Sequence, residues 1–192
     1  MKNKDSNFHN FGAPILVLVV ICFVVTFALA MTYGVTKPII DKNNLAAANE
    51  ARSEIMPEAK GDFKEVKTSH LVLEKNKVFV DDVFEATNGA GCVITVESNS
   101  YGGLLTAMIG IDKDGAITKV KVTSADDTPG VGTRAQAVEH LKQYNGLTKL
   151  GNEQIKNDPT VKYVSGASIS SEAIHKAVYC ALQQYKKMGG VK

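Results

Sequence analysis

Ser165-Gly166-Ala167-Ser168 leads directly into residues 170–185, which have the pattern of an amphipathic helix. The first turn of a helix leaves backbone N–H groups unpaired and carries partial positive charge, so it attracts anions. Glycine and alanine let an anion approach the backbone closely. This junction therefore predicts a phosphate site, at which a flanking serine hydroxyl can hydrogen-bond the phosphate or be esterified to it. The alternative is an ordinary helix start that binds nothing.

The helix itself is predicted from its apolar spacing. Ser170 or Ser171 is expected to cap its start, and Gly189 follows its last turn. His175, early in the helix, is expected at the solvated surface. Apolar side chains recur at steps of three and four residues and so form one face: Ala173, Ile174, Ala177, Val178, Ala181, Leu182 and Tyr185.

A second compact stretch, residues 126–133, lies between two regular segments. Pro129-Gly130 predicts a turn, and Gly132 permits another unusual backbone angle. Such a loop exposes backbone donors and acceptors at defined positions, which suits the edge of a flat heterocycle. The alternative is a hairpin connection without a ligand.

These stretches, together with Ser100-Tyr101-Gly102-Gly103, resemble the motifs of a known family in the same order. The chain resembles the G subunit of Rnf-type membrane complexes, which exchange electrons between ferredoxin and NAD. It is similar, more distantly, to the C subunit of the sodium-pumping NADH:quinone oxidoreductase. Both carry an FMN-binding domain, and the resemblance spans essentially the whole chain.

The resemblance implies FMN held by a phosphoester to Ser168, attached by a separate flavin transferase. This sequence has Lys162 where the family has an acid, Ser168 where threonine is usual, and Asp127 where glutamate is usual. A serine hydroxyl can form the same phosphodiester as threonine. Asp127 is expected to make a polar contact near the ring. The implied cofactor-binding residues are Tyr101, Asp127, Thr128, Pro129, Gly130, Gly132, Ser165, Gly166, Ala167 and Ser168.

The implied function is electron transfer within a membrane complex coupled to ion translocation, with other membrane subunits as partners. In such a carrier the flavin does the chemistry, and no residue is expected to be catalytic in the usual sense. Three alternatives stay open. They are the C-type subunit of the sodium pump, a flavin reductase acting alone, and a non-catalytic anchored binding domain with a degenerate flavin site.

Residues 13–35 carry no charge and exceed the ~20 residues needed to cross a bilayer. They predict a transmembrane helix with Tyr33 at the interface. The alternative is a signal peptide cleaved after residues 28–30, but the apolar run continues beyond that point. We therefore expect a retained anchor in the lipid bilayer.

The anchor divides the chain into parts. We expect a short cytoplasmic tail at residues 1–12, a helical linker at 36–59 and an FMN-binding domain at 60–192. Lysines flank the anchor on both sides, so local charge does not decide its orientation. The family resemblance implies a single-pass protein of the cell (inner) membrane, with its N-terminus in the cytoplasm and its C-terminal domain outside.

The domain is predicted as an α+β fold with a curved, largely antiparallel sheet and flanking helices. Strands are expected at residues 71–73, 78–80, 84–86, 92–96, 104–111 and 116–122, and a helix at residues 134–144. Residues 112–115 read as a tight polar turn.

Composition excludes some classes of function. The net charge is +2 and the lysines are scattered, which gives no footprint for nucleic acid. The cysteines Cys22, Cys92 and Cys180 have no metal-ligand spacing, so no metal site is expected. We expect Cys92 and Cys180 to be buried, with a disulfide between them as the alternative.

Overall fold

The computed structural model describes residues 12–75 and 77–190. The chain divides into two compact units, Met1–Ala47 and Ala48–Lys192. The expected tail at residues 1–12 lies outside the described residues, except for Gly12.

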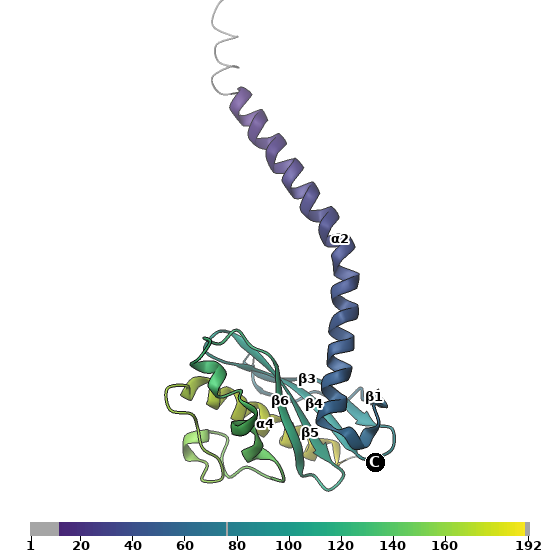
Figure 1. The fold of residues 1–192 in the computed structure, drawn as a ribbon, viewed down its shortest axis with the longest axis vertical. Coiled ribbons are helices and arrows are strands. Elements are labelled where there is room, and N and C mark those ends of the chain that lie inside the picture. The colour runs from purple at the N-terminus through teal and green to yellow at the C-terminus, as the bar shows by residue number, and fades with distance from the viewer. Residues whose placement is uncertain (1–11, 76, 191–192) are drawn as a thin grey trace, which may run out of the picture. The chain divides into compact units, whose positions relative to one another are not determined.

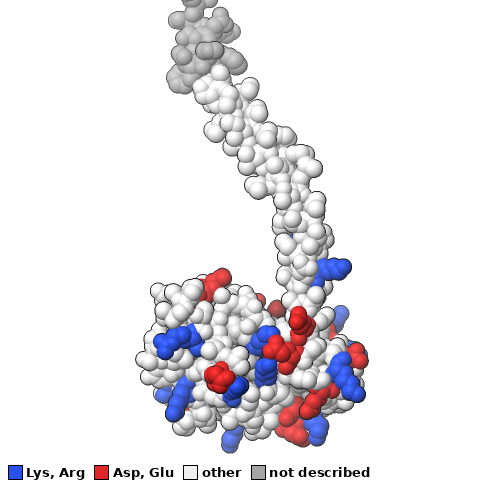
Figure 2. All heavy atoms as spheres, viewed as in Figure 1, with Lys and Arg blue, Asp and Glu red and all other residues white. Residues whose placement is uncertain are grey.

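The first unit is dominated by helix α2 (Ala13–Ile55), which runs through the expected anchor and continues beyond it into the second unit (Figure 1). Its first charged residue is Lys37, and its apolar side chains before that point are exposed, so this length is white in Figure 2. The hydroxyls of Thr32 and Thr36 donate to the carbonyls of Ala28 and Thr32, which satisfies them inside the helix. Among the described helices, α2 alone is long and apolar enough to cross a membrane.

The second unit is built on one antiparallel sheet, which confirms the predicted fold class. Its central strands pair in the order β3-β4-β5-β6, while β1 and β2 both pair with β3. The bounds are β1 (Phe63–Glu65), β2 (Val72–Glu74), β3 (Val78–Ala86), β4 (Gly91–Asn99), β5 (Leu104–Asp112) and β6 (Ile117–Ser124). The sequence had not indicated β1, which is short and largely polar.

The two faces of the sheet carry separate cores. Successive side chains of a strand point to opposite faces: Cys92, Ile94 and Val96 of β4 join the larger core, whereas Val93 joins the smaller one. Helix α4 (Ser168–Met188) covers the larger core. The final turns of α2 cover the smaller one, so the last part of the expected linker packs on the domain.

Gly110 lets the end of α2 lie against the sheet. A Cβ at this position would lie 2.5 Å from Ile55 Cγ2 and 2.3 Å from Thr118 Oγ1. The Thr118 hydroxyl donates to the Ile55 carbonyl at 3.2 Å and so ties the helix end to β6. Arg52, one turn earlier, is buried over the Phe84 ring and pairs with Asp82 at 3.4 Å.

Other connections are short and irregular. The prediction of a single helix at residues 134–144 is wrong, because Ala137 is extended and interrupts it.

Cys92 and Cys180 are buried as expected, and each is a free thiol in the described chain. Asp112 accepts from the N–H groups of Asp114 and Ala116, which makes the predicted turn. The short helices are η2 (Pro57–Ala59), η3 (Gly132–Arg134), α3 (Val138–Leu141), η4 (Lys142–Tyr144) and η5 (Ile155–Asn157).

Gly110→Ala is expected to lower the free energy of unfolding of the full-length chain by about 2 kcal/mol, because the methyl group overpacks the contact with Ile55. Denaturant unfolding in detergent measures this. Gly34→Ala is the matched control, since nothing lies within 4 Å of the added methyl there. Equal stability of the two variants would contradict the packing described for the helix end.

Candidate flavin site

The Asp127 carboxylate is the centre of a buried cluster of hydrogen bonds; the residue is only 5% exposed. The Ser100 hydroxyl donates to it at 2.7 Å, the Gly102 N–H at 3.2 Å and the Gln136 amide at 3.1 Å. The Ser170 hydroxyl is also hydrogen-bonded to it. This carboxylate therefore joins the end of β4, the residues after η3 and the first turn of α4.

Electrostatics agrees with this structural role. Burial alone would raise the pKa of Asp127, but the hydrogen bonds from Ser100, Gly102, Ser170 and Gln136 outweigh burial and leave the pKa below its ordinary value. The carboxylate is therefore ionised at neutral pH. The donors that reach this carboxylate come from three segments of the protein, so its hydrogen bonds hold these segments together beside the pocket.

Glycine allows the same segments to meet closely. A Cβ on Gly102 would lie 1.9 Å from the Asp126 carbonyl oxygen. A Cβ on Gly132 would lie 2.7 Å from Asp127 Cβ and 2.9 Å from Ser170 Oγ. Both glycines thus serve packing: a side chain at Gly132 would separate its loop from Ser170 of α4, and a side chain at Gly102 would displace Asp126.

Helix α4 begins at Ser168, and the predicted capping by Ser170 or Ser171 is wrong. Ser170 binds Asp127 instead, and the Ser171 hydroxyl accepts from the Val164 N–H at 3.0 Å. The N-cap position is Ala167, and no side chain of the described residues caps the helix. The first-turn N–H groups therefore remain available to an anion.

A pocket of about 320 Å³ opens at this helix start. The apolar side chains of Tyr101, Val131 and Ile169 at its wall are 47–70% exposed. Its volume falls within the range of small-ligand pockets, roughly 300–1,000 Å³. The lining residues are Tyr101, Thr128, Val131, Gly132, Gly166, Ala167, Ser168, Ile169 and Ser170.

These residues fit a flavin nucleotide. The uncapped turn offers N–H donors for a phosphate, Ser168 offers a hydroxyl beside them, and the exposed apolar groups offer a surface for a flat ring. Gly166 has φ +82° and open space where a Cβ would stand, which leaves room beside Ser168.

The structure brings most of the predicted residues together. Tyr101, Thr128, Gly132, Gly166, Ala167 and Ser168 line one pocket. Asp127 lies buried beside it, whereas Pro129, Gly130 and Ser165 are exposed and lie outside the described lining. Sequence reasoning missed Val131 and Ile169, although Val131 lies inside the 126–133 stretch and Ile169 directly follows Ser168.

Ser168 and Ile169 also line a second pocket, of about 430 Å³. Its wall is charged and includes Lys156 from η5 and Glu172 and Lys176 from α4. Lys176 is ion-paired with Glu74 from β2. The hydroxyl of Ser168 thus stands between an apolar pocket and a polar one.

The chain contains a domain of a flavin-binding class. A family model described as FMN-binding domain matches residues 100–183, a range that contains every residue of the predicted flavin site. Within this range lie both the Asp127 cluster and most of α4.

Relatives match nearly the whole chain. The G subunit of an ion-translocating oxidoreductase complex from Methanosarcina acetivorans is 30% identical over 181 residues, covering 92% of this chain and 95% of the relative. The G subunit of the Na⁺-translocating ferredoxin:NAD⁺ oxidoreductase complex from Acetobacterium woodii is 29% identical over 194 residues, 90% of each chain. The proton-translocating counterpart of Clostridium ljungdahlii is 24% identical over 199 residues, covering 100% of this chain and 99% of the relative. The chain belongs to the G-subunit family of ion-translocating oxidoreductase complexes.

Asp127→Ala is expected to lower the free energy of unfolding by about 3 kcal/mol, because it leaves buried donors without their charged acceptor. Asp127→Asn retains one carbonyl oxygen and should cost less. Denaturant titration of the full-length chain in detergent measures both.

The same variants have a pH signature. Because the folded pKa of Asp127 is lowered, its stabilisation is present above about pH 4 and is lost as pH falls through the folded pKa. The stability of Asp127→Asn should therefore depend less on pH below about 4 than that of the wild type. An identical acid dependence would show that Asp127 carries no lowered pKa.

Proposed function

We propose that this chain is a membrane-anchored electron-transfer subunit that carries FMN on Ser168 through a phosphoester bond. The observation that carries this proposal is the position of the Ser168 hydroxyl, in the lining of an apolar pocket and at the uncapped start of α4. The FMN-binding domain match over the same residues supports the cofactor.

The relatives support the setting. Two of them are named as subunits of ferredoxin:NAD⁺ oxidoreductase complexes, one Na⁺-translocating and one proton-translocating. We infer that this chain relays electrons inside a complex of that kind, coupled to ion translocation, with other membrane subunits as its partners. The two relatives differ in the ion, so the family leaves the ion open.

The roles of the residues follow from the geometry. The first-turn N–H groups of α4 would bind the phosphate, and Tyr101, Val131 and Ile169 would flank the ring. Bound FMN supplies electron-transfer chemistry that side chains lack. Asp127 hydrogen-bonds residues of the segments that form the pocket wall. Its negative charge beside the pocket would disfavour the additional negative charge of a reduced flavin, and so would lower the reduction potential of a bound flavin.

A covalent bond suits the proposed location. We propose that α2 spans the membrane once and that the domain lies outside the cytoplasm, where free flavin nucleotide is scarce. A dissociable cofactor would be lost there by dilution. A flavin transferase would form the Ser168 Oγ–P bond from a flavin dinucleotide: the P–O–P bond of the dinucleotide breaks, the nucleoside monophosphate leaves, and the serine hydroxyl gives up its proton. The partly exposed serine is accessible to such an enzyme.

Ser168→Ala is expected to abolish flavin attachment, because it removes the oxygen that bonds to phosphorus. Protein isolated from native membranes should lose both in-gel flavin fluorescence and the added mass of FMN less one water. Ser165→Ala is the matched control, since Ser165 is exposed, lies in the same segment and is outside the pocket lining. Fluorescence that persists in Ser168→Ala would refute the attachment site.

The orientation has its own test. Asp114→Cys places a thiol in an exposed turn of the domain, whereas Cys92 and Cys180 are buried and should react slowly. A membrane-impermeant maleimide should label this variant fully in right-side-out vesicles, with a Cys22→Ser background removing the thiol in α2. Labelling that appears only after the vesicles are opened would place the domain on the cytoplasmic side.

A further inference from the structure

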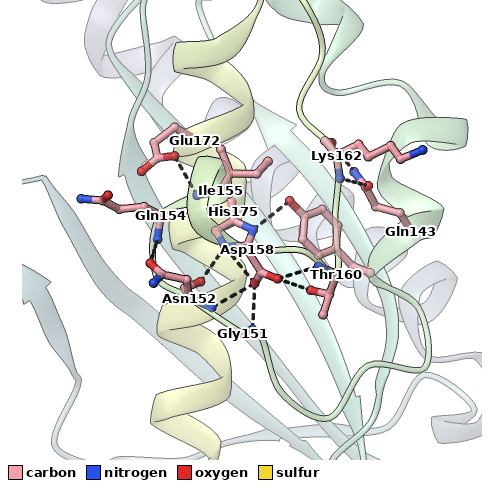
Figure 3. Close-up of polar contacts among 11 residues, drawn as sticks. Gln143, Gly151, Asn152, Gln154, Ile155, Asp158, Thr160, Lys162, Glu172 and His175 are labelled. Carbon is pink, nitrogen blue, oxygen red and sulfur yellow. Dashed lines mark hydrogen bonds and ion pairs between the residues drawn. The ribbon is translucent and has the colours of Figure 1, made fainter.

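A buried polar network lies behind the flavin site, on the inner side of α4 (Figure 3). His175 and Tyr144 are completely buried and Asp158 nearly so, which corrects the expectation that His175 lies at the solvated surface. The His175 Nε2 atom lies 2.8 Å from the Asn152 carbonyl oxygen, and Nδ1 lies 3.4 Å from the Tyr144 hydroxyl. Both ring nitrogens therefore have a partner.

These partners fit the neutral form of the imidazole. The Asn152 carbonyl can only accept, so Nε2 carries the hydrogen, and Nδ1 is left to accept from Tyr144. Burial lowers the pKa of His175, although Asn152, Asp158 and Glu172 act in the opposite direction. The nearest carboxylate oxygen, on Asp158, is 3.6 Å from Nε2 and is bonded elsewhere.

The network fastens residues 151–160, here called the 151–160 loop, to α4. The loop contains little regular structure besides η5. His175 donates to Asn152, and one turn earlier Glu172 accepts from the Ile155 N–H at 3.0 Å. Two adjacent turns of α4 thus hold the loop from one side.

Asp158 closes the 151–160 loop on itself. Its carboxylate accepts from the N–H groups of Gly151 at 2.8 Å, Asn152 at 3.2 Å and Thr160 at 2.8 Å. These hydrogen bonds join the two ends of the loop. The loop is then attached to the rest of the domain by the buried Ile155 side chain and by the hydrogen bonds to His175 and Glu172 of α4.

The loop forms a wall of the polar pocket beside Ser168. Gln154 and Lys156 line that pocket together with Ser168. The other lining lysines, Lys77 and Lys176, both pair with Glu74, whereas Lys156 has no ion pair among the described residues. The loop therefore brings a lysine without an ion pair among the described residues into a pocket that Ser168 borders and that the Glu172 carboxylate also lines.

We propose that His175 is a positioning residue for the flavin site. In its neutral form it fixes the 151–160 loop against α4, and so fixes Lys156 and the polar wall facing the Ser168 phosphoester. This role rests on the proposed function, because it assumes an anionic phosphodiester at Ser168. His175 acts through the loop, because it is not itself among the lining residues of either pocket.

Amide hydrogen exchange tests the attachment itself, with the full-length chain in detergent. His175→Leu should raise the amide exchange rate about tenfold at Gly151, Asn152, Ile155 and Thr160. Removing one partner of a buried hydrogen bond makes local opening of the loop more favourable by about this factor. Strand β5 should be unaffected. His175→Gln should restore protection, since its amide can still donate to Asn152. Unchanged exchange in His175→Leu would overturn the proposal.

A second pair of variants covers the case in which His175→Leu does not fold. Glu172 is only partly buried, so Glu172→Ala should fold and release the same loop by removing the acceptor of Ile155. Glu172→Gln keeps an acceptor oxygen and should leave the loop protected. Equal protection in Glu172→Ala and Glu172→Gln would overturn the attachment.

The flavin reports whether the loop positions the site. His175→Leu should shift the visible absorption spectrum and the reduction potential of the attached flavin, and His175→Gln should return both toward wild type. Gln184→Leu is the matched control, because Gln184 is also buried on α4 and accepts from Leu71 at 2.8 Å but lines neither pocket. Equal shifts in His175→Leu and Gln184→Leu would show general destabilisation and overturn the positioning role.

The two proposals fail in different ways. A wild-type chain that carries no flavin after isolation from native membranes would overturn the proposed function and, with it, the positioning role. A flavin that is attached normally and is unchanged by His175→Leu would overturn the positioning role alone.

Discussion

The candidate site depends on one buried carboxylate. Asp127 accepts hydrogen bonds from the end of β4, from the segment after η3 and from the first turn of α4, which are far apart in sequence. A buried charge is tolerated only when it is well paired, so these donors must stay in place for the domain to fold. The requirement for folding therefore also sets the shape of the pocket. Ser100 and Ser170, which look like ordinary polar residues, become part of the site through this carboxylate.

The sheet provides the frame that makes this possible. Helix α4 packs along the larger core on one face and presents its uncapped start, with Ser168, at one end. The end of α2 packs on the other face around Ile55 and Gly110. The domain is thus fastened to the last turns of the same helix that we propose as its membrane anchor. The buried network around His175 extends the support of α4 to the 151–160 loop.

Local patterns predicted much of this structure. Apolar spacing identified α4 and the apolar part of α2, and β-branched runs identified β4, β5 and β6, because neighbouring residues determine those elements. The motifs also named most of the pocket lining. Strand β1 was not predicted, because a strand that is short and largely polar shows no alternation of apolar and polar residues. Residues 134–144 have helical apolar spacing, but they do not form one helix because Ala137 is extended and precedes α3.

Long-range polar pairing accounts for the remaining differences. Nothing near Asp127 in sequence shows that Ser100 and Gln136 will donate hydrogen bonds to it. The predicted polar contact of Asp127 near the flavin ring stays a prediction. His175 follows Ile174 and precedes Val178 by three residues, which places it at the edge of the apolar face. That spacing was a usable signal of burial. Its partners are Tyr144 of η4 and Asn152 of the 151–160 loop, two separate segments whose proximity only the fold reveals.

The most direct test of the central claim is to locate the flavin on the chain. Trypsin cleavage at Lys162 and Lys176 releases residues 163–176, which contain Ser165, Ser168, Ser170 and Ser171. Fragmentation of this peptide, isolated from native membranes, should place FMN less one water on Ser168. An unmodified peptide from fully assembled complexes, or a modification on another of these serines, would contradict the account.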